Sequence, residues 1–283
     1  MKFSLIIGTL DRPAAFESCY RSLNAQKFKD FEIIVIDQSD NDETADIVKR
    51  INDERIIYRH VNFRGLSRAR NEALKLASGD YFCLIDDDAY YHSDYLAVAS
   101  KNVSPKVILS GYIFDTIKKG DFVGYDSSLN NKKLSMRKII RTCPSAGLVF
   151  PRKVLEDCGA FDERFGVGSL YGAAEETEMI FRALKKGYCV KYIKNMRLKH
   201  PVPVVKSGEL TPQKAKAYFR GFGALYRKHF SVQTVLSGYL ENWIKLIIKR
   251  IVYRGEKKEI VKAQIQGFVR TLLSFQGRRA TEL

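Results

Sequence analysis

Three consecutive aspartates, Asp86, Asp87 and Asp88, follow the apolar run at residues 81–85. Adjacent carboxylates repel one another, and the repulsion is costly unless a cation lies among them. Mg²⁺ and Mn²⁺ prefer one or two protein carboxylates together with phosphate oxygens. Asp86 and Asp88 suit this role because residues two apart in an extended chain point to the same side. The triplet indicates either a divalent-metal site for a phosphorylated substrate or, as the plainer alternative, a solvated acidic turn.

A second acidic group, Glu175 and Glu176, begins a predicted helix directly after a glycine-rich stretch at residues 164–174. Acidic residues are common in a first helical turn because they complement the helix dipole. A carboxylate held there can also act as a general base that takes the proton from an attacking hydroxyl. The residues alone allow both interpretations.

Two further groups have both a structural and a chemical interpretation. His200 is either a packing histidine or a neutral imidazole that completes a metal site with Asp88. Arg68, Arg70 and Asn71 lie at the start of a predicted helix. They form either a solvated basic helix start or a nucleotide site, in which arginine contacts the base or a phosphate at the helix N-terminus.

The elements that must position these residues alternate between apolar runs and amphipathic stretches. We predict strands at residues 3–8, 31–37, 55–60 and 81–85, and helices at 14–26, 42–51 and 67–77. Repeated strand–helix–strand units imply an α/β fold with a parallel sheet and right-handed crossovers. Ligands of such sheets gather at the carboxyl ends of the strands. Thr9, Asp11, Asp37 and the aspartate triplet all follow strands, so we expect them to share one edge.

The rest of the chain changes from mixed to mostly helical. We predict strands at 107–114, 146–150 and 189–193, and helices at 154–159, 175–187, 211–230, 233–253 and 259–275. The segments 116–138 and 164–174 are predicted loops that could close over a substrate. The pattern divides the chain into a catalytic domain, 1–205, and a basic amphipathic helical extension, 206–283.

Composition narrows the class of protein. Hydrophobic residues make up 45% of the 283 residues, which is enough for a packed core. The five cysteines have no zinc-site spacing and suggest reduced thiols in a cytosolic protein. The first apolar run ends at a polar turn without a small-residue cleavage site, so we expect no signal peptide.

The formal net charge of +16 is concentrated in the extension, where sixteen Lys/Arg stand against five Asp/Glu. Nucleic acid and an anionic membrane surface are the two partners that such a charge suggests. The sequence has no helix-turn-helix, zinc-finger or RNP-type signature, so we predict no nucleic-acid partner. Basic residues mixed with Leu, Ile, Trp and Phe in amphipathic spacing favour helices that lie on an anionic membrane. The alternative is a helical cap on the catalytic domain.

Five segments occur in an informative order: SLIIGTLDRP, FEIIVIDQSDNDET, GLSRARNEAL, SGDYFCLIDDD and EETEMIFRALKKGY. Together they closely resemble the family-two inverting glycosyltransferases of GT-A fold, over residues 3–200. The resemblance implies a mostly parallel sheet flanked by helices, a nucleotide-sugar donor and Mg²⁺ or Mn²⁺ at a DxD motif. It also implies inversion at the anomeric carbon by direct displacement.

The resemblance carries roles onto individual residues. It assigns donor binding to Thr9, Asp11, Asp37, Arg70, Asn71, Asp86 and Asp87. It assigns the metal to Asp86, Asp88 and His200, and the general base to Glu176 or its neighbour Glu175. The chain departs from the family pattern at Gly8, where a proline is common, and at Gln38, where a second acid is common. A Glu-Glu pair replaces the usual Glu-Asp.

The sequence therefore predicts an inverting, metal-dependent transfer of a sugar, from a UDP-hexose, to a glycan acceptor that is lipid-linked. The expected setting is bacterial surface polysaccharide synthesis, as in capsule assembly, in the cytoplasm at the inner face of the cell membrane. The alternatives are an inactive glycan- or membrane-binding scaffold of the same fold, a basic nucleic-acid-binding protein and a nucleotidyltransferase. The donor sugar, the linkage and the oligomeric state are left open by the sequence.

Overall fold

The computed structural model describes residues 1–117, 119–121, 127–201, 210–230 and 248–274. The chain divides into two compact units. The first consists of Met1–Phe161 and Met179–Val202, and the second of Asp162–Glu178 and Pro203–Leu283. A boundary between a catalytic domain and an extension at residue 205 stays a prediction.

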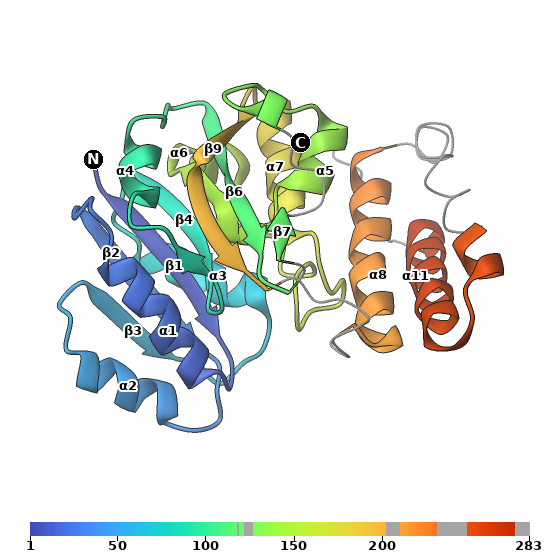
Figure 1. The fold of residues 1–283 in the computed structure, drawn as a ribbon, viewed down its shortest axis with the longest axis horizontal. Helices are drawn as coiled ribbons and strands as arrows, with labels where there is room; N and C mark the ends of the chain where they lie inside the picture. Colours follow the sequence, from blue (N-terminus) through green and yellow to red (C-terminus); the bar gives the residue numbers. More distant parts are fainter. Residues whose placement is uncertain (118, 122–126, 202–209, 231–247, 275–283) are drawn as a thin grey trace. The chain divides into compact units, whose positions relative to one another are not determined.

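The described part of the first unit is built on a nine-stranded sheet of order β3-β2-β1-β4-β8-β6-β9-β5, with β7 paired to β6 (Figure 1). The strands are β1 (Phe3–Thr9), β2 (Phe31–Asp37), β3 (Ile56–His60), β4 (Tyr81–Asp86), β5 (Tyr90–Tyr91), β6 (Val107–Asp115), β7 (Gly120–Asp121), β8 (Leu148–Pro151) and β9 (Cys189–His200). The first four strands of the order are parallel, as predicted. Beyond β4 the sheet is mixed, because β8 runs antiparallel to both β4 and β6.

Helices of six to twelve residues connect and cover these strands. They are α1 (Pro13–Asn24), α2 (Glu43–Ile51), α3 (Leu66–Leu76), α4 (Tyr95–Ser100), α5 (Met136–Thr142) and α6 (Lys153–Cys158). Helix α1 begins at Pro13, where the missing N–H costs nothing. Its buried face carries Phe16, Cys19 and Leu23, spaced by three and four residues. Helix α2 is followed by its C-cap Asn52, which takes the left-handed conformation at φ 49°.

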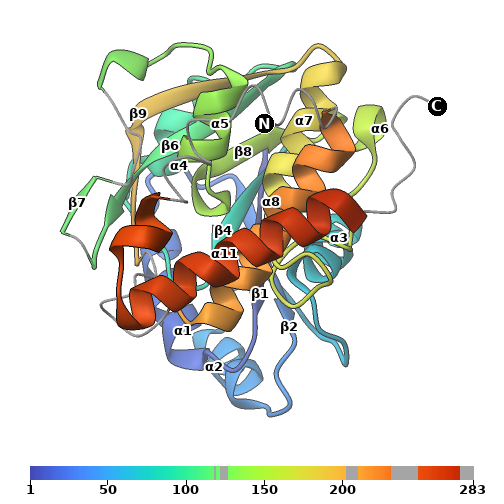
Figure 2. The ribbon, with the colours of Figure 1, turned by 90° about the vertical axis from the view of Figure 1, so that its right-hand side faces the viewer.

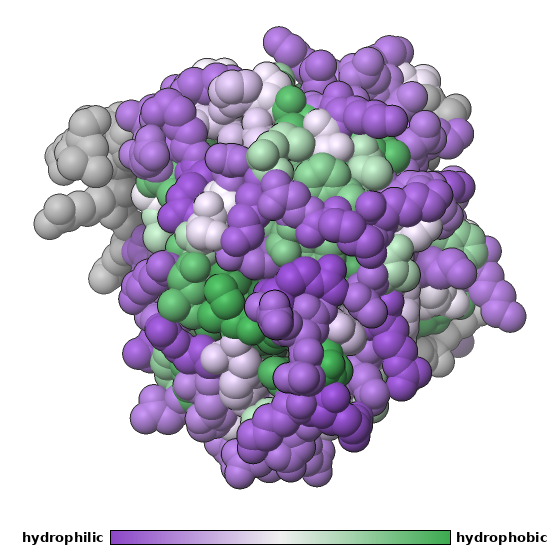
Figure 3. Space-filling model, turned by 90° about the vertical axis from the view of Figure 1, so that its left-hand side faces the viewer, coloured by the Kyte–Doolittle hydropathy of each residue, from purple (hydrophilic) through white to green (hydrophobic). Residues whose placement is uncertain are grey.

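The core of the first unit lies on both faces of the parallel strands. All seven residues of β2 are buried, and so are all but one of β1. Strands covered on both faces have continuous apolar runs, which is why the sequence predicts them so closely. The edge strand β3 is only partly buried. The face that includes this edge is mostly hydrophilic, with hydrophobic side chains gathered in its middle (Figure 3).

Two segments differ from the sequence prediction. The predicted loop 116–138 contains strand β7, a 3₁₀ turn at Ser127–Leu129 and the start of α5. The predicted strand 189–193 continues to His200. After a bulge between Gly111 and Tyr112, the added residues pair with the second half of β6. This extension brings His200 to the edge of the sheet where the aspartates lie.

The described part of the second unit contains two long helices, α8 (Pro212–His229) and α11 (Gly255–Ser274), which cross each other (Figure 2). Thr211 caps the start of α8, because its hydroxyl accepts a hydrogen bond from the Lys214 amide at 3.2 Å. Most of the predicted helix 233–253 lies outside the described residues. Within the described ranges, every helix is too short or too polar to cross a bilayer. Helix α7 (Glu175–Lys185) begins in the second unit and ends in the first.

Candidate functional site

The predicted clustering at one edge of the sheet is present. Strand β1 pairs with β2 so that Thr9 stands beside Asp37, and with β4 so that Gly8 stands beside Asp86. The carboxyl ends of these three parallel strands therefore meet, which is where ligands bind in sheets of this kind. Gly8 allows close packing, because a Cβ there would lie 3.1 Å from the Leu66 side chain of helix α3.

Arg12 connects two of the three aspartates at this edge. Its Nη1 lies 2.7 Å from Asp87 Oδ1, and its Nη2 lies 2.6 Å from Asp88 Oδ2. The Thr9 hydroxyl donates to the other oxygen of Asp87 at 2.8 Å. Burial raises the pKa of Asp87 to about 6, although Arg12 and Thr9 act to lower it. Asp87 is thus held by the protein itself, whereas Asp88 is more exposed.

His200 contacts the other two aspartates. Its Nε2 lies 3.1 Å from Asp88 Oδ1 and 3.4 Å from Asp86 Oδ2. Burial acts to lower the pKa of His200, but the hydrogen bonds to both carboxylates outweigh it and raise this pKa to about 10. Burial opposes the shift at Asp88 as well, where His200 and Arg12 lower the pKa to about 2. In this arrangement a protonated imidazole neutralises two carboxylates.

Asp86 also contacts Arg70 and Ser145. The side chain of Arg70 is 1% exposed, and its Nη2 lies 3.2 Å from Asp86 Oδ1. The Ser145 hydroxyl lies 3.1 and 3.0 Å from the two carboxylate oxygens. Burial acts to raise the pKa of Asp86, but His200 and Arg70 lower it below its usual value. Arg70 therefore lies beside the aspartates, and its role in donor binding stays a prediction.

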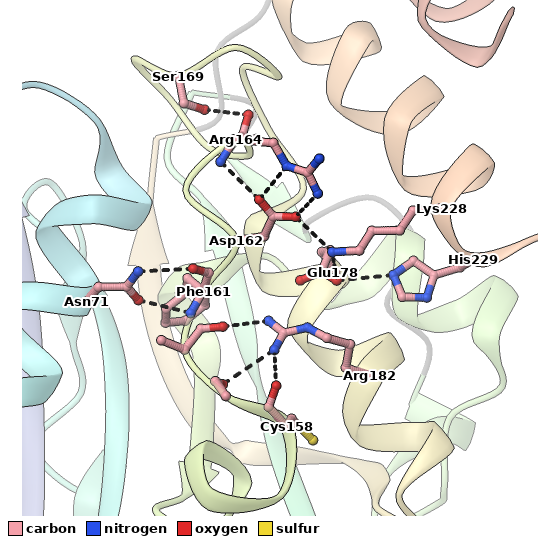
Figure 4. A network of polar contacts seen from close by, with 12 residues as sticks. Asn71, Cys158, Phe161, Asp162, Arg164, Ser169, Glu178, Arg182, Lys228 and His229 are labelled. Carbon is pink, nitrogen blue, oxygen red and sulfur yellow. Dashed lines mark hydrogen bonds and ion pairs between the residues drawn. The ribbon is translucent and has the colours of Figure 1, made fainter. Parts of the chain in front are cut away.

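Asn71, the neighbour of Arg70, takes a different position. Its side-chain amide donates to the Phe161 carbonyl at 3.0 Å and accepts from the Phe161 amide at 2.9 Å (Figure 4). The Phe161 ring in turn lies 5.9 Å from the Arg70 guanidinium. Asn71 thus fixes the backbone that packs on Arg70, and its role in donor binding stays a prediction.

Asp37 is fully buried and firmly held. One carboxylate oxygen accepts the Ser39 amide at 2.9 Å and the Ser39 hydroxyl at 2.6 Å. The other accepts the Tyr58 hydroxyl at 2.8 Å. The same Ser39 hydroxyl accepts the amide of Asp11, which has a left-handed φ of 53°. These bonds fix two of the predicted donor-binding residues at the edge.

Sequence reasoning missed Arg12, Ser145 and Tyr58. Arg12 was detectable, because it follows Asp11 directly in the loop after a predicted strand. Ser145 belongs to a short 3₁₀ turn before β8, and Tyr58 to the edge strand β3. Neither has a local pattern that points to Asp86 or Asp37, so only the fold reveals these contacts.

The acidic pair belongs to the second unit. Glu175 is buried and Glu176 is partly buried, both in the first turn of α7. The residue before them, Ala174, has a left-handed φ of 71°. A non-glycine residue in this conformation costs on the order of 1 kcal/mol and marks a backbone that its surroundings constrain. The assignment of a general base to this pair stays a prediction.

The metal assignment can be tested by ligand chemistry. Asp86, Asp88 and His200 supply carboxylate oxygens and an imidazole, which suit Mn²⁺ or Mg²⁺. They contact one another and Arg12 directly. In the described ranges no three or more His, Cys, Asp and Glu side chains stand in an arrangement that could hold a metal ion. The ligand types therefore fit a divalent cation, whereas their present contacts are with each other.

A match to a known family shows the class of this protein. Residues 4–151 match the family model of Glycosyl transferase family 2. The match covers more than half of the chain, and the chain belongs to this family. The predicted family and its GT-A fold are confirmed.

Curated relatives match about a third of the chain. One is the UDP-Glc:alpha-D-GlcNAc-diphosphoundecaprenol beta-1,3-glucosyltransferase WfaP of Escherichia coli, 38% identical over 89 residues. Another is the GalNAc(5)-diNAcBac-PP-undecaprenol beta-1,3-glucosyltransferase of Campylobacter jejuni, 36% identical over 91 residues. The matched part is 31% of this chain in both cases, and 36% and 29% of the two relatives.

Solved structures share the fold over nearly the whole chain. The mannosyltransferase PcManGT of Pyrobaculum calidifontis, in complex with GDP-Man and Mn²⁺, has a TM-score of 0.67 and 16% identity. That similarity covers 97% of this chain and 88% of PcManGT. TarS (residues 1–349) of S. aureus has a TM-score of 0.65 and 18% identity, covering 96% of this chain and 81% of that one. At these identities the likeness shows the fold alone.

Proposed function

We propose that this protein is an inverting, metal-dependent glycosyltransferase that moves a sugar from a UDP-hexose to a lipid-linked glycan acceptor. The observation that carries the proposal is the cluster of Asp86, Asp88, His200 and Arg12 at the carboxyl edge of the sheet. Membership of Glycosyl transferase family 2 supports the reaction class. The donor is suggested by UDP-Glc in the name of the E. coli relative and by a TarS complex with UDP-GlcNAc.

The donor diphosphate is bound, in this proposal, where the aspartates meet the arginines. Asp86, Asp88 and His200 would hold Mn²⁺ or Mg²⁺, and the cation would replace both the proton that His200 shares with the two carboxylates and the contact of Asp88 with Arg12. The cation would neutralise negative charge on the departing diphosphate. Arg12, released from Asp88, would donate to a phosphate oxygen. Asp37, held by Ser39 and Tyr58, reads the uracil base.

The chemical step is a direct displacement. The acceptor hydroxyl oxygen forms a bond to the anomeric carbon while the bond from that carbon to the diphosphate oxygen breaks. The electron pair leaves with UDP, and the hydroxyl proton passes to the carboxylate of Glu176. We place the base at Glu176 because it is the more accessible of the pair. One displacement of this kind inverts the anomeric configuration.

The acceptor and the location are proposed from the relatives and from the charge of the tail. Both relatives described above are named for acceptors linked to diphosphoundecaprenol or PP-undecaprenol. The basic extension supplies positive charge for an anionic membrane, which is where such lipids lie. We therefore propose that the protein works in the cytoplasm at the inner face of the cell membrane, in surface polysaccharide synthesis.

The product of a defined reaction tests this proposal. The wild-type protein is incubated with UDP-glucose, Mn²⁺ and a lipid that carries α-linked GlcNAc on a diphosphate, and the new linkage is assigned by NMR. A β-linked glucose in the product supports the proposal. An α-linked product contradicts inversion. UDP release from the donor without any transfer to this lipid contradicts the acceptor class but leaves the donor class standing.

A further inference from the structure

Helix α8 touches the acidic segment of the second unit at two points that flank Glu175 and Glu176. The first point is Gly221, where a Cβ would overlap the backbone of Ala173, two residues before Glu175. The second is Lys228, whose Nζ lies 2.8 Å from Oε1 of Glu178, two residues after Glu176. Gly221 and Lys228 are seven residues apart in a continuous helix, so they lie on the same face.

The contact at Lys228 is a buried network (Figure 4). Glu178 has no exposed side-chain surface, and Lys228 is 14% exposed. His229 Nε2 lies 3.3 Å from the same Glu178 oxygen. Lys228 also reaches Asp162 at 2.8 Å, and Asp162 is held by Arg164 at 2.7 Å. A buried carboxylate left without its cation is unfavourable, so this network strongly favours a single position of Glu178.

The contact at Gly221 depends on the absence of a side chain. The hypothetical Cβ would approach the carbonyl oxygen, the carbonyl carbon and the amide nitrogen of Ala173 at less than 3 Å. A second close approach lies nearby, where a Cβ on Gly172 would be 2.8 Å from Ala217 Cβ. Backbone this tightly packed cannot shift independently of α8. The left-handed Ala174 lies between these contacts and Glu175.

We infer that α8 is a positioning element for the general base, with Gly221 and Lys228 as its two positioning residues. The inference rests on the proposed function, because it takes the acidic pair to be the base. Neither residue touches the reacting atoms in this account. Each acts by holding the backbone on one side of Glu175 and Glu176, so that the carboxylate keeps one orientation. A helix outside the part matched by the family model therefore contributes to catalysis.

Hydrogen exchange of the intact protein tests the inference without any donor. In Lys228→Met, the amides of residues 173–178 are expected to exchange at least tenfold faster than in the wild type. Lys228→Arg keeps the positive charge and is expected to restore most of the protection. The control is Lys262→Met, which breaks an exposed pair to Glu259 on α11 and is expected to change nothing at 173–178. Unchanged exchange in Lys228→Met overturns the inference.

Turnover separates positioning from donor binding. UDP release from UDP-glucose is measured with Mn²⁺, and UDP affinity by calorimetry. In Lys228→Met and Gly221→Ala, kcat is expected to fall by about 10²-fold, the effect of misplacing a reacting group by about 1 Å, while the UDP Kd is unchanged. If Lys228→Met does not fold, Gly221→Ala decides the matter, and Lys228→Arg is expected to keep most of the wild-type kcat. Wild-type kcat in folded Lys228→Met or Gly221→Ala overturns the inference, whereas absence of UDP-glucose turnover in the wild type contradicts the proposed donor instead.

Discussion

The imidazole of His200, the last residue of β9, lies 3.1 Å from the carboxylate of Asp88, just beyond the end of β4. Arg12 holds the other oxygen of the same carboxylate at 2.6 Å. Asp88 is thus paired with two cationic side chains that come from two different strand ends. We propose that a divalent cation and a diphosphate enter this cluster of three residues by replacing contacts within it.

Removal of Arg12 is expected to destabilise the folded protein more in the absence of a divalent cation than in its presence. Arg12→Met leaves Asp87 and Asp88 without one of their cations, and we expect a loss of about 1 kcal/mol in the free energy of unfolding for this half-exposed group. Saturating Mn²⁺ supplies positive charge and is expected to reduce this loss of stability. Thermal unfolding of wild type and Arg12→Met, with chelator and with Mn²⁺, measures the loss under each condition. An equal loss under the two conditions would argue against a cation at Asp88. The control is Arg21→Met, which removes an exposed arginine of α1.

The two glutamates of α7 are expected to differ in their effect on catalysis. Glu176→Gln removes the proposed base, so kcat for UDP release from UDP-glucose should fall by about 10²- to 10⁴-fold with an unchanged UDP Kd. Glu175→Gln is expected to lower the melting temperature and to reduce kcat less than Glu176→Gln does, because Glu175 is buried, with 5% of its surface exposed. Steady-state kinetics and calorimetry on both variants measure the difference. A larger loss of kcat in Glu175→Gln would move the base to that residue.

Glu32 is expected to govern part of the acid stability. Burial acts to raise its pKa, but hydrogen bonds from Lys2, Ser4 and Ser78 lower it to about 2, whereas the unfolded value is 4.5. Its contribution to stability is therefore complete above about pH 4.5 and is lost as the pH falls toward 2. Chemical unfolding of Glu32→Gln from pH 7 to pH 3 should show a weaker protein at pH 7 and a smaller loss on acidification. The exposed Glu54→Gln is the control, and parallel pH profiles of wild type and Glu32→Gln would contradict the assignment.

The basic extension is expected to bind anionic lipid. Sedimentation with phosphatidylglycerol vesicles should exceed that with phosphatidylcholine and should fall as salt rises. Replacing Lys257 and Lys258 by Glu should weaken vesicle binding at least tenfold, since each basic residue near the surface contributes about 1 kcal/mol. Lys49→Glu, on the exposed face of α2 in the first unit, should leave it unchanged. Equal binding to both lipids would contradict a role of the basic charge, and no binding to either lipid would favour the alternative of a helical cap.

The sequence predicts best those parts whose burial is uniform. Strand β2 matches its predicted bounds, because both faces are covered and every residue is apolar or fixed by hydrogen bonds. Strand β9 is longer than predicted, since its second half alternates buried and exposed residues and pairs with β6 only after a bulge. The fold class needs no long-range information beyond the order of strands and helices.

In the candidate site too, the sequence predicts what local patterns specify and misses contacts between distant segments. Asp37, Asp86 and Asp88 could be placed at one edge because each stands where a predicted strand ends. The contacts of Ser145 with Asp86, and of Lys228 with Glu178, join segments far apart in the chain. No local pattern in the sequence encodes which partner a buried carboxylate will find, so these residues emerge only from the packed structure.

Binding of nucleotide-sugars with and without metal decides whether Asp88 belongs to a metal-dependent donor site. Thermal unfolding is followed across a panel of nucleotide-sugars with Mn²⁺, with Mg²⁺ and with chelator, for wild type, Asp88→Ala and the control Asp30→Ala. Asp30 precedes β2 at the opposite end of the strands, so its loss should not affect the donor. We expect metal-dependent stabilisation by a UDP-hexose in wild type and Asp30→Ala, and none in Asp88→Ala. No stabilisation by any nucleotide-sugar, with or without metal, would rule out the proposed donor site and favour an inactive scaffold of the same fold.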